Sequence, residues 1–89
     1  MRTVQRTTRF KKDYKREQKT LPDLEGILRP VVEMLVKGDP LPAKLMDHPL
    51  GGEWKGCRDC HVKPDLVLIY SLIESELTLI RLGSHSELF

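Results

Sequence analysis

Hydrophobic positions in the first half of the chain repeat with the period of an α-helix. Five apolar residues three or four positions apart form one amphipathic stripe, at Leu24, Ile27, Leu28, Val31 and Leu35. Pro30 lies inside this stripe and costs a helix about 3 kcal/mol, so we expect a kink or a fresh helical start there. The string Lys37-Gly38-Asp39-Pro40 is a strong signal for the end of the helix.

A strand and a second, more polar helix are predicted before this segment. Residues Thr3 to Thr8 are rich in β-branched side chains and partly alternate, which favours a first strand. Thr7 or Thr8 can then cap a helix in which Phe10 and Tyr14 share one face. The rest of that helix is charged, so it is expected to bury a narrow stripe and to expose a basic surface.

The hydrophobic period changes to two after a loop expected at Leu41–Glu53. Three further strands are predicted at Trp54–Val62, Asp65–Leu72 and Leu77–Leu82, with connections short enough for antiparallel hairpins. The order β-α-α-β-β-β predicts an α+β fold, in which two helices pack on one face of a twisted, mainly antiparallel sheet. A length of 89 residues is that of one domain, which we place at 1–89.

Alternation along the strands predicts which side chains share a face. Asp59 and His61 are expected to project from the same surface, where the alternative to a functional role is an exposed ion pair. On the last strand Leu77, Leu79 and Arg81 have the same parity and are expected on one face. Arg81 follows so apolar a run that it either extends to solvent at an edge or holds an anion.

Positive charge is concentrated at the start of the chain. The net charge is +2, but residues 1–20 carry eight basic and only two acidic side chains. A basic segment attracts phosphate polyanions in a salt-dependent manner, although a solvated helix face has the same composition. The cations predicted to face such a partner are Lys11, Lys12, Lys15 and Arg16.

The chain has no sequence signal for a membrane or for secretion. No apolar run approaches the roughly 20 residues that span a bilayer, and the N-terminal residues lack a hydrophobic signal segment. Two cysteines are too few for a disulfide framework. We therefore expect a cytoplasmic protein with reduced thiols.

All three histidines lie in polar, turn-rich strings of the second half of the chain, as His48, His61 and His85. Imidazole has a reference pKa of about 6.5 and exchanges protons near neutral pH. Three imidazoles among carboxylates and arginines suggest proton-transfer chemistry on an anionic substrate.

A CxxC string is formed by Cys57 and Cys60, which raises the alternative of a zinc-binding nucleic-acid module. Residues three apart on a strand face opposite sides of the sheet, so the two thiols are expected to diverge. Structural zinc needs four convergent ligands. We therefore predict no metal and no cofactor, and thiols that act as small, partly buried hydrophobic groups.

The second half of the chain resembles the YafQ branch of the RelE/ParE toxin superfamily. The resemblance rests on residues 48–70 and 81–89, and above all on Trp54, Arg58-Asp59, His61, Pro64-Asp65, Arg81 and the segment from His85 to Phe89. It implies a RelE-like fold and a bacterial type II toxin: an endoribonuclease that cleaves mRNA in the ribosomal A site, contacts ribosomal RNA and is neutralised by a cognate antitoxin. Leu66 and Cys57 stand where aromatic residues are frequent in the family.

The resemblance also implies which residues act. The implied active-site positions are His48, Asp59, His61, Asp65, Arg81, His85 and Phe89, and we add Lys55 and Arg58 as expected substrate contacts. RNA cleavage without a metal needs a base for the 2′-OH, an acid for the departing 5′-oxygen and a cation on the phosphate.

We expect His85 to be the acid, Arg81 to be the cation and Phe89 to stack on a base. The general base is expected to be His48 or His61. The remaining alternative is a ParE-like toxin that binds a protein target and has no nuclease chemistry.

Overall fold

The computed structural model describes residues 2–89. Its helices are α1 (Thr8–Thr20), α2 (Leu24–Lys37) and the short α3 (His85–Leu88), with single 3₁₀ turns at η1 (Ala43–Leu45) and η2 (Gly52–Trp54). Its strands are β1 (Thr3–Arg6), β2 (His48–Pro49), β3 (Arg58–Lys63), β4 (Leu66–Ile73) and β5 (Glu76–Gly83). Thr7 caps α1, because its hydroxyl accepts a hydrogen bond from the Phe10 amide.

The strands form one five-stranded sheet in the order β1-β5-β4-β3-β2. The neighbours from β2 to β5 are antiparallel, and β4 and β5 are the central hairpin. β1 pairs with β5 in parallel, with Val4 opposite Leu77. The predicted α+β fold is confirmed, with two N-terminal helices and a mixed, mostly antiparallel sheet.

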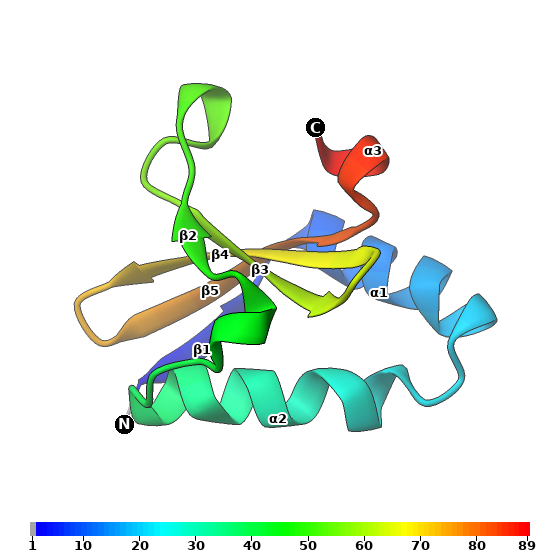
Figure 1. The fold of residues 1–89 in the computed structure, drawn as a ribbon, viewed down its shortest axis with the longest axis horizontal. Helices are drawn as coiled ribbons and strands as arrows, with labels where there is room; N and C mark the ends of the chain where they lie inside the picture. Colours follow the sequence, from blue (N-terminus) through cyan, green and yellow to red (C-terminus); the bar gives the residue numbers. More distant parts are fainter. Residues whose placement is uncertain (1) are drawn as a thin grey trace.

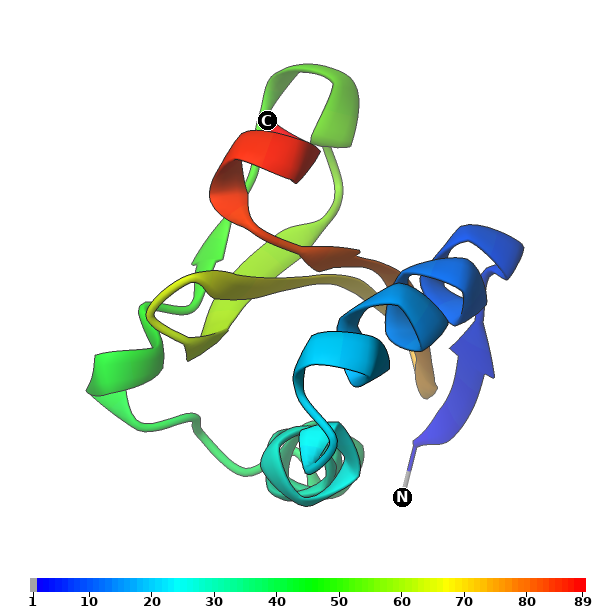
Figure 2. The ribbon, with the colours of Figure 1, turned by 90° about the vertical axis from the view of Figure 1, so that its right-hand side faces the viewer.

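The two faces of the sheet are covered differently. Figures 1 and 2 show α2 lying across one face, whereas α3 and the loop with η2 stand on the opposite face. The main core lies between α1, α2 and the first face, and its helical members are Phe10, Leu24, Leu28, Val31 and Leu35. A smaller cluster on the opposite face contains Val67, Ile69 and Leu88. Burying each such side chain stabilises the fold by about 1.5–3 kcal/mol.

α2 runs without interruption through Pro30, so the expected fresh helical start is wrong. Its apolar stripe stays in register with the core on both sides of the proline, at Leu28, Val31 and Leu35. Burial of this stripe offsets the hydrogen bond that the proline removes. Gly38 closes the helix in the left-handed conformation, as the stop signal predicted.

Two details of the sheet differ from the prediction. The predicted strand at Trp54–Val62 begins only at Arg58, because residues 52–54 form η2 and Gly56 turns the chain with a φ of 90°. The expected loop at 41–53 contains the two-residue strand β2, which pairs with β3. A strand of two residues has too few positions to show alternation, and sequence periodicity does not reveal it.

An irregularity in β5 changes the face on which Arg81 lies. Leu79 lies opposite Tyr70 and Arg81 lies opposite Ile69, so Ile80 is an extra residue in β5. Leu77 and Leu79 therefore belong to the main core, whereas Arg81 projects from the face that carries Ile69. The expectation that these three residues share a face is wrong, because a β-bulge reverses the alternation beyond it.

Candidate functional site

The sheet brings residues from four strands into one row. His48 on β2 lies opposite Asp59 on β3, Asp59 lies opposite Ile69 on β4, and Ile69 lies opposite Arg81 on β5. Side chains that face one another across adjacent strands project from the same face of the sheet. The neighbouring row on that face contains His61, Val67 and Gly83.

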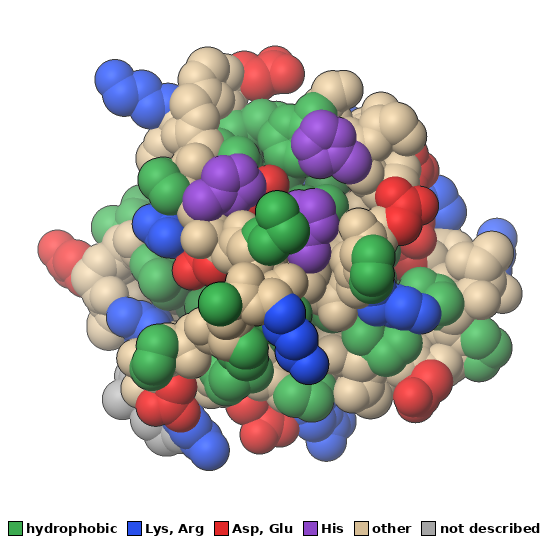
Figure 3. Space-filling model, in the orientation of Figure 1, with side chains coloured by type: hydrophobic (Ala, Val, Ile, Leu, Met, Phe, Trp, Pro, Cys, Tyr) green, Lys and Arg blue, Asp and Glu red, His purple; other side chains and the backbone are tan. Residues whose placement is uncertain are grey.

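All three imidazoles lie on this face of the molecule. Figure 3 shows the histidines (purple) grouped there around hydrophobic side chains. Burial raises the pKa of Asp59, and the charges of His48, His61 and His85 act on it in the opposite direction. One buried carboxylate thus interacts electrostatically with all three imidazoles, and we call this group the histidine cluster.

His48 and Asp59 form the closest pair within the cluster. The His48 Nδ1 atom lies 2.5 Å from Asp59 Oδ1, and the Asp59 side chain is only 3% exposed. The contact has the distance of an ion pair but not the direction of a hydrogen bond, since Oδ1 has no hydrogen-bond partner among residues 2–89. Asp59 therefore does not form an exposed ion pair with His61, which was the alternative to a functional role. Its position leaves the Nε2 side of the His48 ring turned away from the carboxylate.

The segment that carries His48 is fastened to the opposite face of the sheet. Asp47 Oδ1 accepts a hydrogen bond of 2.6 Å from the Tyr70 hydroxyl and one of 3.2 Å from Arg58 Nε. Arg58 lies opposite Tyr70 in the sheet, so its side chain belongs to the core face and not to the histidine cluster. In the structure, Arg58 thus binds Asp47, the residue that precedes His48.

His85 and Phe89 lie at the two ends of α3. Ser84 caps this helix in a reciprocal box, because its hydroxyl accepts from the Glu87 amide and its own amide donates to the Glu87 carboxylate. The His85 and Phe89 rings are in contact in a tilted arrangement, with centroids 4.8 Å apart and an interplanar angle of 36°. Phe89 is 47% exposed, so the terminal aromatic ring is not buried in the core.

Arg81 holds an anion that belongs to the protein itself. Its Nε donates to Asp13 Oδ2 at 2.7 Å and its Nη2 donates to Asp13 Oδ1 at 3.3 Å. Asp13 lies on α1 and is 3% exposed. Of the two readings of Arg81 from the sequence, holding an anion is the one that the contacts support.

The remaining predicted residues lie at the edges of the cluster. His61 is half-buried, and its Nδ1 atom lies 3.4 Å from the Pro64 carbonyl oxygen. Asp65 is exposed in the turn between β3 and β4. Lys55 is exposed in the turn after η2.

The whole chain is similar to a family of known proteins. A sequence model of the family described as "Bacterial toxin of type II toxin-antitoxin system, YafQ" matches residues 2–89. The chain belongs to this family. The mRNA interferase toxin YafQ of Escherichia coli K12 is 42% identical over 89 residues, which cover 99% of this chain and 96% of that relative. The resemblance predicted from the sequence is confirmed, and this relative has the predicted enzyme class.

Solved structures of YafQ proteins have the same fold. The crystal structure of YafQ from E. coli BL21(DE3) matches with a TM-score of 0.91 and 40% identity, covering 100% of this chain and 99% of that one. The crystal structure of the E. coli DinJ-YafQ complex matches with a TM-score of 0.90 and 41% identity, with the same coverage. YafQ family membership therefore rests on sequence and on fold over the whole length.

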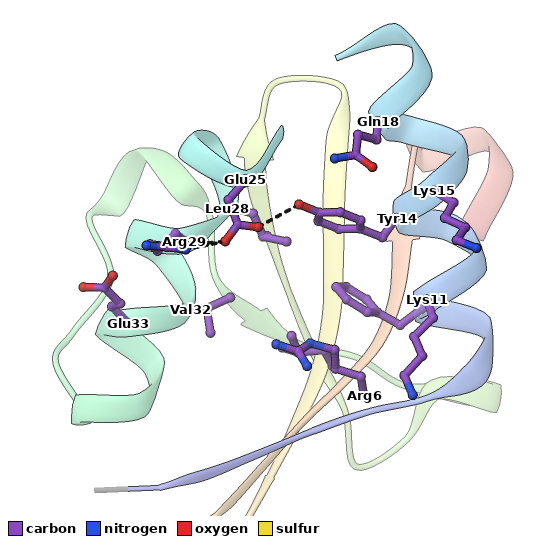
Figure 4. A pocket seen from close by; sticks show the side chains of 12 residues that line it. Arg6, Lys11, Tyr14, Lys15, Gln18, Glu25, Leu28, Arg29, Val32 and Glu33 are labelled. Atoms are coloured by element: carbon purple, nitrogen blue, oxygen red, sulfur yellow. Dashed lines mark hydrogen bonds and ion pairs between the residues drawn. The ribbon is translucent and has the colours of Figure 1, made fainter. Parts of the chain in front are cut away.

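The basic surface of this YafQ family member borders a cleft between its two long helices. Figure 4 shows the cleft, of about 720 Å³, with Lys11 and Lys15 of α1 on one wall and Arg29 of α2 on the other. The Tyr14 hydroxyl donates to Glu25 at 2.8 Å across it. Lys11, Lys12 and Lys15 are exposed as predicted. The fourth predicted cation, Arg16, is paired within the molecule with Asp13 and Glu17.

The two cysteines diverge as predicted. Cys57 packs on the histidine face, whereas Cys60 is fully buried in the main core. Burial raises the pKa of Cys60 to about 12. Within residues 2–89, no three His, Cys, Asp or Glu side chains are grouped to hold a metal ion. In the same residues, no helix has the length and apolar character to cross a bilayer.

The sequence prediction missed the residues that hold the site in place. Asp13 was counted only as an acidic residue within a basic helix, although it binds Arg81. Asp47 and Tyr70 were not identified as partners. No local pattern distinguishes these roles for Asp13, three positions after Phe10, or for Asp47 in a loop, because their partners lie far away in the sequence.

Proposed function

We propose that this protein is the toxin of a type II toxin–antitoxin system and cleaves mRNA in the ribosomal A site without a metal. The support is the convergence of His48, His61 and His85 with Asp59 and Arg81 on one face of the sheet. A protein-binding surface has no chemical need for three titratable rings beside a guanidinium. Full-length similarity to an mRNA interferase supports the choice of substrate.

The proposed reaction is a transesterification that releases the downstream RNA fragment. A base removes the proton of the ribose 2′-OH, the 2′-oxygen attacks the adjacent phosphorus, and the bond between phosphorus and the 5′-oxygen breaks. An acid protonates that 5′-oxygen, which leaves a 2′,3′-cyclic phosphate and a 5′-hydroxyl. Each well-placed acid or base contributes about 10²- to 10⁴-fold to the rate.

We assign the base to His48 and the acid to His85. Asp59 lies at His48 Nδ1, so the nitrogen that accepts the proton is Nε2 on the other side of the ring. His85 lies on the rim formed by α3, where a leaving group can reach it. His61 and Asp65, which lies in the turn that follows β3, complete the proton-transfer group, and Lys55 contacts the RNA backbone.

Charge stabilisation is assigned to Arg81 and base stacking to Phe89. Arg81 lies in the same cross-strand row as His48 and on the same face, and we place the reacting phosphate between its guanidinium and the imidazoles. The exposed Phe89 ring packs against His85 at a tilt and has its exposed surface available to a nucleobase.

Mapping of message ends tests the nuclease assignment. Purified protein is treated with EDTA, freed of the chelator and added to translating ribosomes, and cleaved 5′ ends are mapped by primer extension. We expect cuts from the wild type and a loss of about 10²- to 10⁴-fold in His85→Ala. Ser86→Ala, a neighbouring exposed position of α3, is the matched control and should cleave normally.

The outcomes separate the alternatives. Full activity of His85→Ala contradicts the acid assignment. Intact message with persisting growth arrest favours a ParE-like toxin that binds a protein. Stoichiometric zinc in the purified protein, with activity lost to EDTA, favours the zinc module built on Cys57 and Cys60.

A cognate antitoxin and ribosomal RNA are the proposed partners, and the cytoplasm is the proposed compartment because translation occurs there. The YafQ of E. coli has been crystallised with DinJ. We place contacts with an acidic antitoxin segment or with ribosomal RNA on the exposed cations Lys11, Lys12 and Lys15. Reversing these three charges should weaken ribosome association and reduce its salt dependence. Unchanged association at all salt concentrations would exclude this surface.

A further inference from the structure

A buried carboxylate outside the histidine cluster collects hydrogen bonds from two arginines. Asp13 accepts from Arg81 at 2.7 and 3.3 Å, from Arg16 Nη1 at 3.0 Å and from the Leu82 amide at 3.1 Å. Burial alone raises the pKa of Asp13, but the bonds from Arg81 and Leu82 outweigh it and lower that pKa below its ordinary value. Asp13 therefore carries its charge in the folded protein.

This arrangement sets the direction of the Arg81 side chain. A guanidinium has five N–H groups in one rigid plane, and two of them bind Asp13 along the edge of Nε and Nη2. The other N–H groups remain as donors for an oxyanion. The Arg81 side chain is only 12% exposed, so Asp13 and its surroundings confine it.

The same turn of α1 also holds the start of α3. Arg16 Nη2 donates to the Leu82 carbonyl at 3.1 Å, and Arg16 Nε lies 3.4 Å from the Glu87 carboxylate that closes the cap of α3. Gly83 leaves room for this approach, since a Cβ there would lie only 3.0 Å from Arg16 Nη2 and would push the guanidinium outward. Asp13 and Arg16 thus fasten both Arg81 and the helix of His85 to α1.

We propose that Asp13 is a positioning residue for RNA cleavage, which directs the free edge of Arg81 at the reacting phosphate. Arg16 has the corresponding function for α3 and His85. This inference rests on the proposed nuclease function. Asp13 does not touch the RNA, so its effect on the reaction is transmitted through Arg81.

A double-mutant cycle distinguishes positioning from a purely structural role. We expect Asp13→Asn to lower the single-turnover cleavage rate about 10- to 100-fold while the KM for programmed ribosomes changes little. In an Arg81→Ala background the same substitution should change the rate by less than about threefold, because the group that it positions is absent. Asp39→Asn, an exposed acid in the loop after α2, is the control for the change of charge and should cleave normally.

The proposal would be overturned if Asp13→Asn lowered the cleavage rate equally in the wild-type and Arg81→Ala backgrounds. Unchanged cleavage by Asp13→Asn alone would also overturn it. Thermal unfolding accompanies each variant. If Asp13→Asn does not fold, the variant Arg81→Lys tests the proposal instead. Lysine keeps the charge but lacks the planar guanidinium, so this variant should cleave as slowly as Arg81→Ala. Wild-type cleavage by Arg81→Lys refutes the positioning role. A fully active His85→Ala would instead refute the proposed function itself.

Discussion

The hydroxyl of Tyr70 offers a sharp test of how the sheet holds His48. Tyr70 is fully buried on β4, and its hydroxyl donates to Asp47 Oδ1 at 2.6 Å. Asp47 precedes His48, whose strand has only two residues. Burial and the bond to Asp47 raise the pKa of Tyr70 well above its usual value, so the hydroxyl remains a donor at working pH. Tyr70→Phe removes this donor and leaves the ring in place.

The expected loss of stability follows from the contacts. A hydrogen bond to a charged group contributes about 1.5–3 kcal/mol, and no cavity is created because only one oxygen is removed. Arg58 still donates to Asp47 in the variant, so we expect the lower end, about 1.5 kcal/mol. In a domain of this size that corresponds to a fall in Tm of about 6 °C or more. Cleavage should fall as well, because β2 loses one of the side-chain bonds next to His48.

Urea unfolding followed by the fluorescence of Trp54, the one tryptophan of the chain, measures the effect. The m-value should be unchanged, so that the midpoint reports stability alone. Tyr14→Phe is the matched control, since it also removes a hydroxyl bonded to a carboxylate, Glu25, but in an exposed cleft. Water replaces that bond, and stability should hardly change. If Tyr70→Phe were as stable and active as the wild type, the reasoning about Asp47 would be wrong.

Three further results are expected. Burial raises the pKa of Asp59, so ionisation of this carboxyl lowers the free energy of unfolding above the raised pKa, whereas below the unfolded value of 3.8 it has no effect. Asp59→Asn should therefore raise Tm at pH 7 but not below about pH 4. Cleavage should fall in this variant. Bonds to Arg81 lower the pKa of Asp13 despite burial, so the Asp13 carboxylate stabilises the folded protein above pH 3.8, and this stabilisation is lost as the pH falls through the lowered pKa. Acid unfolding of Asp13→Asn should lack this loss of stability. Phe89→Ala removes a half-exposed ring, so the free energy of unfolding should change by less than about 1 kcal/mol while the cleavage rate falls.

Local patterns in the amino-acid sequence were enough for the two long helices, the four longer strands and their order, but not for the short β2 and α3. The stripe from Leu24 to Leu35 marked α2, and the short connections between the last three strands marked antiparallel hairpins. Alternation also placed Asp59 and His61 on one face and separated Cys57 from Cys60. These features depend on neighbours within a few residues, for which hydrophobic period and turn chemistry are sufficient.

The placement of the site residues depends on contacts between distant parts of the chain. The bulge at Ile80 turns Arg81 from the core face to the histidine face, and alternation alone predicted the opposite. Asp13 reaches Arg81 from a helix 68 residues earlier, and Asp47 reaches Tyr70 across the sheet. Neither carboxylate belongs to a repeat or motif. Their roles arise from packing, because a buried charge is stable only where the fold brings donors to it, and those donors are defined once strands and helices have assembled.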